Sequence, residues 1–340
     1  MHMPGKLKIS SSPDVVEYDP VDLFNRAAKY EEAGFDYLWE GDHTLPWHHT
    51  GGHCSSATVM LEAYLAKTKR IKAGFMVLSP IGIRNNPVDV ALVSATMARL
   101  HPGRFALCVG TGEAMNERTT IGFWPSAKER LERLDEAIQV IKMCWTSNDY
   151  FKFRGKYFKP FFYMYDKPQE PIPLYCAANG PRAARIAGKY ADGFVSINPP
   201  QYYKDVIIPT VTQAAKEAGR DPDQIERAAW ISTFYDADME KALESARRYA
   251  GLLIPECYHS IDDPRIIEAR ASLVRDDVLA KVFAIVTSAD ELISRIEQYI
   301  KVGVDHPILA EGSPNPDHAM PAYKKVITYL RDTYKHVPVR

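Results

Sequence analysis

Residues 37–54, YLWEGDHTLPWHHTGGHC, pass in one step from a strand-like run to a dense polar loop. Tyr37, Leu38 and Trp39 form a short apolar run, and Gly34 just before it would end a preceding helix. The loop that follows holds an acid, four of the chain's ten histidines, a tryptophan and a Gly-Gly pair. Such a loop at the end of a strand indicates a functional site carried by a scaffold. The alternative is a surface loop whose histidines face water.

The same change from strand to helix recurs along the chain. We expect strands at 6–12, 35–40, 71–78, 104–109, 174–178, 193–197, 227–235 and 306–310. We expect helices at 19–33, 56–67, 87–100, 126–145, 181–190, 202–218, 239–249, 289–302 and 319–330. Eight βα units favour an α/β fold of the (β/α)₈ TIM-barrel type over an open doubly wound sheet. We expect one domain over 1–340, with inserted segments at about 146–170 and 251–281 and a hairpin over 151–158.

Composition excludes several classes of partner. The chain has 340 residues and a formal net charge of −1, without a long run of one sign. This balance argues against nucleic acid and anionic membranes as partners. No apolar segment approaches the roughly 20 residues of a membrane helix, and no signal-peptide pattern is visible, so we expect a cytoplasmic protein. The five cysteines are widely spaced and include no Cys-x-x-Cys, which favours reduced thiols.

In a TIM barrel the C-terminal ends of all strands meet at one mouth. His43 stands at such an end beside Asp42, and it is a candidate general base because histidine needs little tuning to accept a proton near neutral pH. A metal site is the alternative, since the loop contains several possible ligands, namely His48, His49, His53 and Cys54. Their spacing matches no familiar zinc pattern, so we expect no metal.

Two further strand ends carry small residues. Gly110-Thr111-Gly112 begins like a dinucleotide fingerprint but lacks the third glycine, so a Rossmann site is not expected. Its glycines would still let a flat or phosphorylated ligand approach the backbone. Glu113 then either faces the mouth or caps the next helix. Residues 177–180 precede Pro181 at a helix start, where bare amides could bind a cofactor phosphate or simply form a turn.

Taken together, these motifs resemble the deazaflavin-dependent dehydrogenases of the bacterial luciferase-like superfamily, among them the F420-dependent glucose-6-phosphate and secondary alcohol dehydrogenases. The resemblance covers nearly the whole chain. It rests on these stretches: Gly41-Asp42-His43, Pro46-Trp47, Gly51-Gly52-His53, Pro80, Asn86-Pro87, Gly110-Thr111-Gly112-Glu113-Ala114, Asn116-Glu117, Ala177-Ala178, Gly180-Pro181, Asp192-Gly193-Phe194 and His259-Ser260-Ile261-Asp262-Asp263-Pro264.

The resemblance implies coenzyme F420, a small-molecule substrate and a homodimer. It implies that His43 is the base, that Trp47 contacts the substrate oxygen, and that Glu113 is an acid or charge partner near the deazaflavin. A non-prolyl cis peptide would join Met76 and Val77. The residues implied to line the coenzyme are Asp42, Met76, Val77, Ser79, Gly110, Thr111, Gly112, Asn116, Ala177, Ala178, Asn179 and Gly180.

One departure from the family pattern concerns the substrate. Sugar-phosphate members carry three basic residues, whereas this chain has SINPPQ at 196–201, Tyr258 at the second position and Val282 at or near the third. Lys281 and Arg275 lie nearby in sequence. Because a phosphate dianion needs fixed positive partners, we expect glucose 6-phosphate to be a poor substrate.

The expected reaction is therefore hydride transfer between an alcohol and C5 of F420. A sugar-phosphate dehydrogenase, an FMN-dependent luciferase-like monooxygenase, a reductase of a pterin-bound one-carbon unit and a non-catalytic F420-binding relative are the alternatives.

Overall fold

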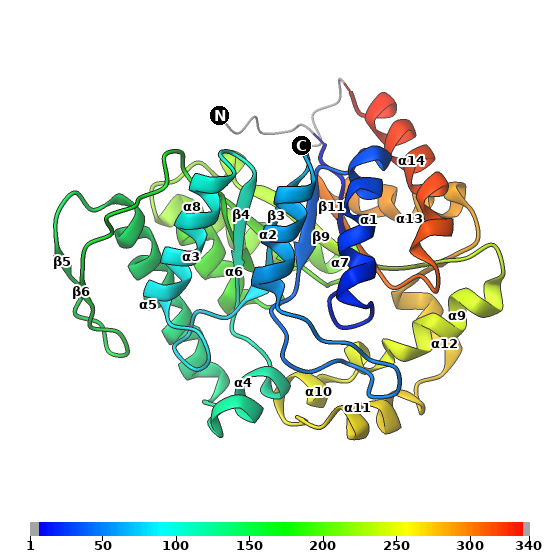
Figure 1. The fold of residues 1–340 in the computed structure, drawn as a ribbon, viewed down its shortest axis with the longest axis horizontal. Helices are drawn as coiled ribbons and strands as arrows, with labels where there is room; N and C mark the ends of the chain where they lie inside the picture. The colour runs from blue at the N-terminus through cyan, green and yellow to red at the C-terminus, as the bar shows by residue number, and fades with distance from the viewer. Residues whose placement is uncertain (1–6, 336–340) are drawn as a thin grey trace.

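The computed structural model describes residues 7–335, and its centre is a closed ring of parallel strands (Figure 1). The ring consists of β1 (Ser10–Ser12), β2 (Tyr37–Glu40), β3 (Lys72–Leu78), β4 (Phe105–Val109), β7 (Leu174–Ala177), β8 (Gly193–Ser196), β9 (Glu226–Tyr235) and β11 (His306–Glu311). Each strand pairs with the next, and β11 closes the ring on β1, where Ser10 lies opposite Ile308. The predicted eight-stranded barrel is confirmed. Position 6, where the first strand was expected to begin, lies outside the described residues.

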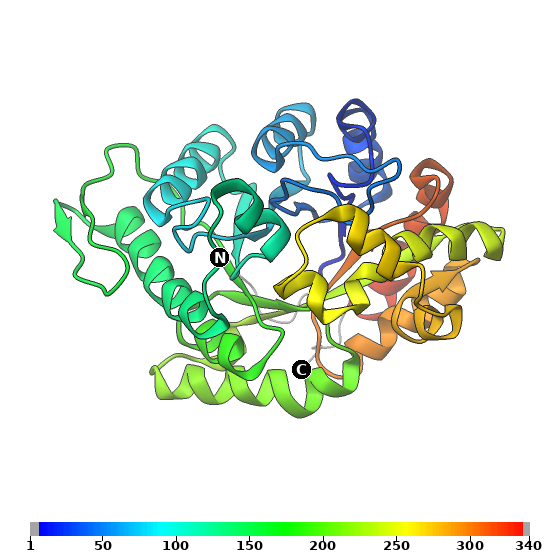
Figure 2. The ribbon, with the colours of Figure 1, turned by 90° about the horizontal axis from the view of Figure 1, so that it is seen from below.

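Helices surround this ring, as the view turned by 90° shows (Figure 2). The main ones are α1 (Pro20–Ala33), α2 (Ala57–Lys67), α3 (Pro87–Leu100), α5 (Ala127–Thr146), α6 (Pro181–Tyr190), α8 (Ile208–Glu217), α9 (Met239–Arg248), α13 (Ala289–Ile300) and α14 (Pro316–Thr333). Among residues 7–335, no helix has both the length and the apolar character needed to cross a membrane.

Local sequence signals explain where these elements begin and end. The carboxylate of Asp19 accepts a hydrogen bond from Val21 N at the start of α1, and Gly34 ends the helix with a left-handed φ of 101°. Successive side chains of β2 then point alternately into and out of the barrel. Tyr37 and Trp39 stack inside the barrel, with ring centroids 4.9 Å apart, whereas Glu40 points outward and accepts a hydrogen bond from Tyr64 on α2.

The hairpin differs from the prediction. Its strands are β5 (Phe151–Lys152) and β6 (Phe161–Phe162), so the pairing spans more chain than the expected 151–158. The carboxylate of Glu136 on α5 accepts hydrogen bonds from three successive backbone amides at 156–158. The intervening loop therefore folds against α5, and a tight turn at Arg154-Gly155 does not form.

The segment 251–281 contains helices, which the sequence reading left undescribed. They are α10 (Pro255–His259), α11 (Pro264–Ala271) and α12 (Asp276–Val282). The prediction also missed α4 (Ala114–Ile121) and the short strand β10 (Ala284–Val286). Thr233 pairs with Glu311 of β11 and with Ala284, so β10 extends β9 beyond the end of β8 and does not enter the ring.

The expected helix over 202–218 is also interrupted. It consists of α7 (Pro200–Tyr202), a π-helical segment (Tyr203–Ile207) and α8. Pro209 stands in the first turn of α8 and has no backbone N–H to donate, so the regular hydrogen-bond register changes just before it.

Candidate active site

The strand residues that are exposed to solvent identify the mouth of the barrel. Helices cover the outside of the ring, so a strand side chain can be exposed only through an open end. Near the C-terminal ends of the strands, several partly exposed residues have buried neighbours, among them Val77, Ala177, Trp230, Ser232 and Ala310. Most of these side chains are small.

Trp230 and Ser232 were not among the predicted site residues. Both lie on β9, where Ala228 and Trp230 contact the residues inside the barrel, and Ser232 continues the same face toward the mouth. Alternation along 227–235 was the available signal. It identifies the inward face but not the depth of each residue in the barrel.

His43 follows β2 and is recessed in this mouth, with 14% of its side chain exposed. Its Nδ1 lies 3.2 Å from Leu45 O and 3.2 Å from Nδ2 of Asn116. Its Nε2 lies 3.7 Å from Oε2 of Glu113. Burial lowers the pKa of His43 to about 4, so its imidazole is neutral near pH 7 and able to accept a proton.

Glu113 stands immediately before α4, but its side chain does not cap that helix. Its Oε2 instead accepts a hydrogen bond of 3.0 Å from Nδ2 of Asn116. Burial, reinforced by the nearby carboxyl of Glu117, raises the pKa of Glu113 to about 8. At neutral pH it is therefore an uncharged acid beside a neutral imidazole, which is the pairing that general acid–base chemistry requires.

Trp47 completes the group of three predicted catalytic side chains. It is 6% exposed, and its ring centroid lies 5.9 Å from that of His43 and 5.1 Å from that of Tyr258. The hydroxyl of Tyr258 donates to Leu252 O at 3.1 Å, so the tyrosine contributes its ring to the wall. His43 and Glu113, seventy positions apart in the sequence, thus meet with Trp47 at the barrel mouth.

The predicted coenzyme-lining turns adjoin this group. The peptide bond between Met76 and Val77 is cis, which confirms that structural prediction. A methyl group at Gly110 would lie 2.6 Å from Cγ1 of Val77 and 3.3 Å from Cβ of Ala177, so the three strand ends are in close contact there. Gly112 has a φ of 71°, which favours glycine. Its turn packs over Ser79, and Thr111 beside it is partly exposed.

The side chain of Asp42 is already engaged. Its Oδ2 accepts hydrogen bonds from Nη2 of Arg84 at 2.7 Å and from Nδ2 of Asn85 at 2.8 Å. Its backbone carbonyl also accepts from Arg84. The carboxylate therefore anchors the loop before His43, and little of it remains for a coenzyme contact.

The turn before α6 has the geometry of an anion site. Gly180 is the N-cap residue and supplies no capping side chain, and the space around its Cα is open for 4 Å in the direction of a side chain. Asn179 accepts from Ile197 N and from the hydroxyl of Ser196, each at 3.1 Å, which ties this turn to the end of β8. No side chain caps the backbone N–H groups at the start of α6, and such a helix start can bind an anion.

His48 docks the loop against α11. Nε2 of His48 lies 3.4 Å from Oε1 of Glu268 on α11, and Thr50 N donates to the same carboxylate. Cys54 is exposed. Over residues 7–335, no three side chains of His, Cys, Asp or Glu gather as they would around a metal ion.

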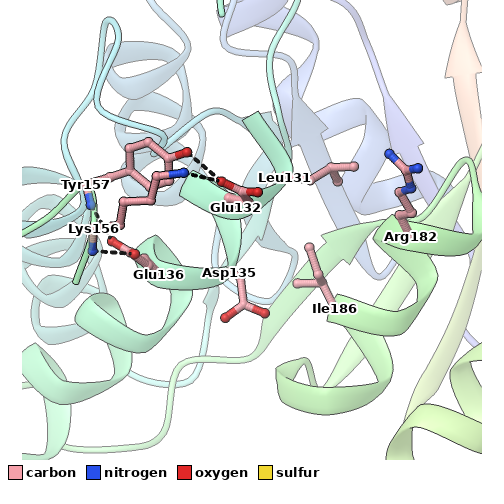
Figure 3. A pocket seen from close by; sticks show the side chains of 8 residues that line it. All are labelled: Leu131, Glu132, Asp135, Glu136, Lys156, Tyr157, Arg182 and Ile186. Carbon is pink, nitrogen blue, oxygen red and sulfur yellow. Dashed lines mark hydrogen bonds and ion pairs between the residues drawn. The ribbon is translucent and has the colours of Figure 1, made fainter. Parts of the chain in front are cut away.

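A separate cleft of about 390 Å³ lies on the outside of the barrel, between α5, the loop before β6 and α6 (Figure 3). Its carboxylates are occupied: Glu132 accepts from Lys156 and Tyr157, and Glu136 holds backbone amides. None of the predicted catalytic residues lines it, so we assign no chemistry to this cleft.

Comparison with known proteins agrees with the motifs. The luciferase-like monooxygenase family model matches residues 8–306. The F420-dependent glucose-6-phosphate dehydrogenase of Amycolatopsis mediterranei is 38% identical over 305 residues, covering 88% of this chain and 91% of that protein. The enzyme of the same name from Nocardia farcinica is 39% identical over 308 residues, covering 89% and 91%.

A solved structure is also very similar. An F420-dependent secondary alcohol dehydrogenase, in complex with an F420-acetone adduct, superposes with a TM-score of 0.93 at 35% identity, covering 96% of this chain and 100% of that one. The resemblance inferred from the motifs is thereby confirmed. A closed parallel barrel, a mouth that gathers His43, Trp47 and Glu113, and matches along nearly the whole chain lead to one conclusion: this chain belongs to the luciferase-like monooxygenase family.

Proposed function

We propose that this chain is an F420-dependent oxidoreductase that transfers a hydride between the carbinol carbon of a small, uncharged alcohol and the deazaflavin ring. The observation that carries the proposal is the meeting of three side chains at the barrel mouth. They are a neutral imidazole, a nearly buried indole and an uncharged carboxylic acid, from His43, Trp47 and Glu113.

The coenzyme assignment draws on the relatives and on the shape of the mouth. The relatives described above are named as F420-dependent enzymes. Small partly exposed strand residues at the mouth favour a flat ring there, and the start of α6, which no side chain caps, suits its phosphate. The turns at Gly110 and Gly112 and the Met76–Val77 peptide would hold the ring. When bound, F420 would supply the hydride acceptor at C5.

The chain's own residues would manage the protons. Nε2 of His43 would take the hydroxyl proton of the alcohol as the carbinol carbon loses its hydride. Nε1–H of Trp47, whose ring lies 5.9 Å from that of His43, would donate to the oxygen that becomes a carbonyl. Glu113 would offset the negative charge gained by the ring, as a proton donor or as a hydrogen-bond donor.

The wall of the site supports an uncharged substrate. Tyr258, at a position where sugar-phosphate members carry a lysine, packs its ring on Trp47. Arg275 and Lys281 both pair with Asp277 of α12, and both side chains are 76% exposed. Val282 is half-exposed. No fixed cation among these residues faces the imidazole, so a phosphate dianion would lose several kcal/mol of binding, on the order of 1.5–3 for each missing charged hydrogen bond.

The test is a substrate panel with purified protein and F420, followed by the loss of the oxidised coenzyme's visible absorbance. The proposal expects turnover of secondary alcohols such as 2-propanol and little turnover of glucose 6-phosphate. A kcat/KM for glucose 6-phosphate above that for every alcohol would replace this assignment with the activity for which the relatives at 38–39% identity are named. Flavin that copurifies with the protein, together with oxygen uptake, would favour a monooxygenase.

A further inference from the structure

Asn116, on α4, is 4% exposed, and its side-chain amide has a fixed orientation. Its Oδ1 accepts hydrogen bonds from the backbone amides of Thr44 at 2.9 Å and Leu45 at 3.4 Å. The hydroxyl of Thr44 also donates to the backbone carbonyl of Asn116 at 3.2 Å. A flipped amide would set N–H donors against N–H donors, so the NH₂ group must face the barrel mouth.

That NH₂ group has two hydrogens and two targets. Nδ2 of Asn116 lies 3.0 Å from Oε2 of Glu113 and 3.2 Å from Nδ1 of His43. One buried side chain therefore connects both of the residues to which we assign proton chemistry.

The two partners of Nδ1 of His43 make opposite demands. Leu45 O, at 3.2 Å, requires a proton on Nδ1, whereas the N–H of Asn116, also at 3.2 Å, requires a lone pair there. If Nδ1 is bare, the ring proton sits on Nε2, which lies 3.7 Å from Glu113. If Nδ1 is protonated, in the neutral ring or in the imidazolium, it donates to Leu45 but faces a second donor.

We propose that Asn116 is a positioning residue for His43: it opposes protonation of Nδ1 and thereby sets the balance between the two neutral tautomers. It limits the Nδ1–H form, whose bare Nε2 can take the alcohol proton, and it also opposes the imidazolium. The proposal rests on the proposed function for its catalytic meaning, but its geometry does not depend on the coenzyme. The charged or titratable groups that face His43 are Asp42, Arg84 and Glu113. Of these, Asp42 raises and Arg84 lowers the pKa of His43, and both effects are weaker than that of burial.

The test is Asn116→Asp, which keeps the acceptor for Thr44 and Leu45 but replaces NH₂ by an oxygen. Nδ1–H of His43 then gains a second acceptor, so the Nδ1–H tautomer should dominate and the pKa of His43 should rise by about one unit or more. Both quantities are read from ¹⁵N NMR of histidine-labelled protein without coenzyme, with the His43 signals assigned by their absence in His43→Gln.

Two further variants isolate the cause. Asn116→Ala removes the opposing donor without adding charge, so it should also move the ring toward Nδ1–H, with a smaller rise in pKa. Asn315→Asp is the matched control, because Asn315 is the N-cap of α14, where aspartate also caps well, and it should leave the His43 signals unchanged.

The proposal is overturned if the tautomer ratio and pKa of His43 are the same in Asn116→Asp as in the unchanged protein. With F420 and an alcohol, the acid limb of kcat/KM should move upward with the NMR pKa. A shifted NMR pKa in a protein that turns over no alcohol would refute the proposed function and leave the role of Asn116 standing.

Discussion

At the scale of single residues, the site depends on two side chains whose pKa values stand in the opposite order from that in water, where a carboxyl group titrates below an imidazole. His43 has its pKa lowered to about 4 and Glu113 has its pKa raised to about 8, both mainly by burial. The imidazole is therefore ready to accept a proton and the carboxyl is ready to donate one over the same pH range. Neither residue alone would indicate a reaction, but the pair at 3.7 Å does.

These pKa values predict the pH profile of alcohol oxidation. The base is available above pH 4, and Glu113 stays protonated below pH 8, so kcat/KM should be flat between these limits and fall outside them. The glutamine of Glu113→Gln cannot ionise, so this variant should show no fall in kcat/KM above pH 8. If Glu113 donates a proton in the reaction, the variant should also lower kcat by about 10²–10⁴. An alkaline limb that persists in Glu113→Gln would assign that limb to another group.

Tyr258 provides a prediction about specificity. Tyr258→Lys would place an ammonium group beside Trp47, and one charged hydrogen bond to a phosphate is worth about 1.5–3 kcal/mol. The kcat/KM for glucose 6-phosphate should rise at least about tenfold, while that for 2-propanol should fall. Tyr258→Phe keeps the ring without the charge and should produce no such gain. An unchanged preference in Tyr258→Lys would show that this position does not contact the substrate.

How much of the site could be predicted differs between residues. His43, Trp47 and Glu113 stand in short motifs, so the resemblance identified them, and their meeting follows once the strands close into a barrel. The two hydrogen bonds of Asn116 with opposite demands could not be predicted, because they depend on how the loop at 44–45 meets α4 in space. Trp230 was missed because the sequence does not give its depth in the barrel.

At the scale of elements, segment 251–281 is fastened to the mouth by contacts from distant helices. Arg118 of α4 donates to Asp262 and to Ser260 O, each at 2.6 Å, and Glu268 of α11 accepts from Thr50 N in the loop after β2 at 2.8 Å. Figure 1 shows α4, α10, α11 and that loop at the same end of the barrel. The wall that carries Tyr258 is thus held by contacts that cross between elements.

This arrangement predicts a local change without global unfolding. Arg118→Ala should increase amide hydrogen exchange in 255–270 and raise KM, because a partly exposed pair of this kind contributes about 1 kcal/mol at most to stability. Arg265→Ala is the matched control, since Arg265 pairs with Asp263 two residues away and crosses to no other element. Equal exchange in the two variants would contradict the fastening role of Arg118.

Elements were predictable where periodicity is strong and unpredictable where it is weak. All eight ring strands are buried for most of their length and were found; they contain apolar runs except β1, which consists of three buried serines. β10 is only three residues long and follows a helix at once, and α4 has buried polar residues such as Asn116 and Glu117, so neither shows a clear pattern. The hairpin shifted because Glu136, on another element, organises its loop.

At the scale of the whole molecule, stability depends on buried acids that are protonated in the folded state. Glu40 is fully buried at the end of β2, and burial raises its pKa to about 8. A carboxyl with a raised pKa contributes stability fully below its unfolded pKa near 4.5, and this contribution is lost as the pH rises through 8.

The glutamine of Glu40→Gln cannot lose a proton. The free energy of unfolding of this variant, compared with that of the unchanged protein at the same pH, should therefore increase as the pH rises. The gain between pH 5 and pH 9 should be about 4 kcal/mol, even if the amide costs one hydrogen bond to Val15 N at all pH values. Denaturant unfolding at several pH values measures this difference, with Glu244→Gln on the exposed face of α9 as the control. A difference that does not change with pH would refute the raised pKa.

The central claim is that one site on this barrel moves a hydride and a proton between an alcohol and F420. The most direct measurement is the rate of F420 absorbance loss with 2-propanol at pH 7 in the unchanged protein, His43→Ala and Glu113→Gln. The account predicts turnover in the first and a loss of about 10²–10⁴ in His43→Ala, with a loss in Glu113→Gln as well. Equal rates in all three proteins, or no reduction of bound F420 by any alcohol, would contradict it.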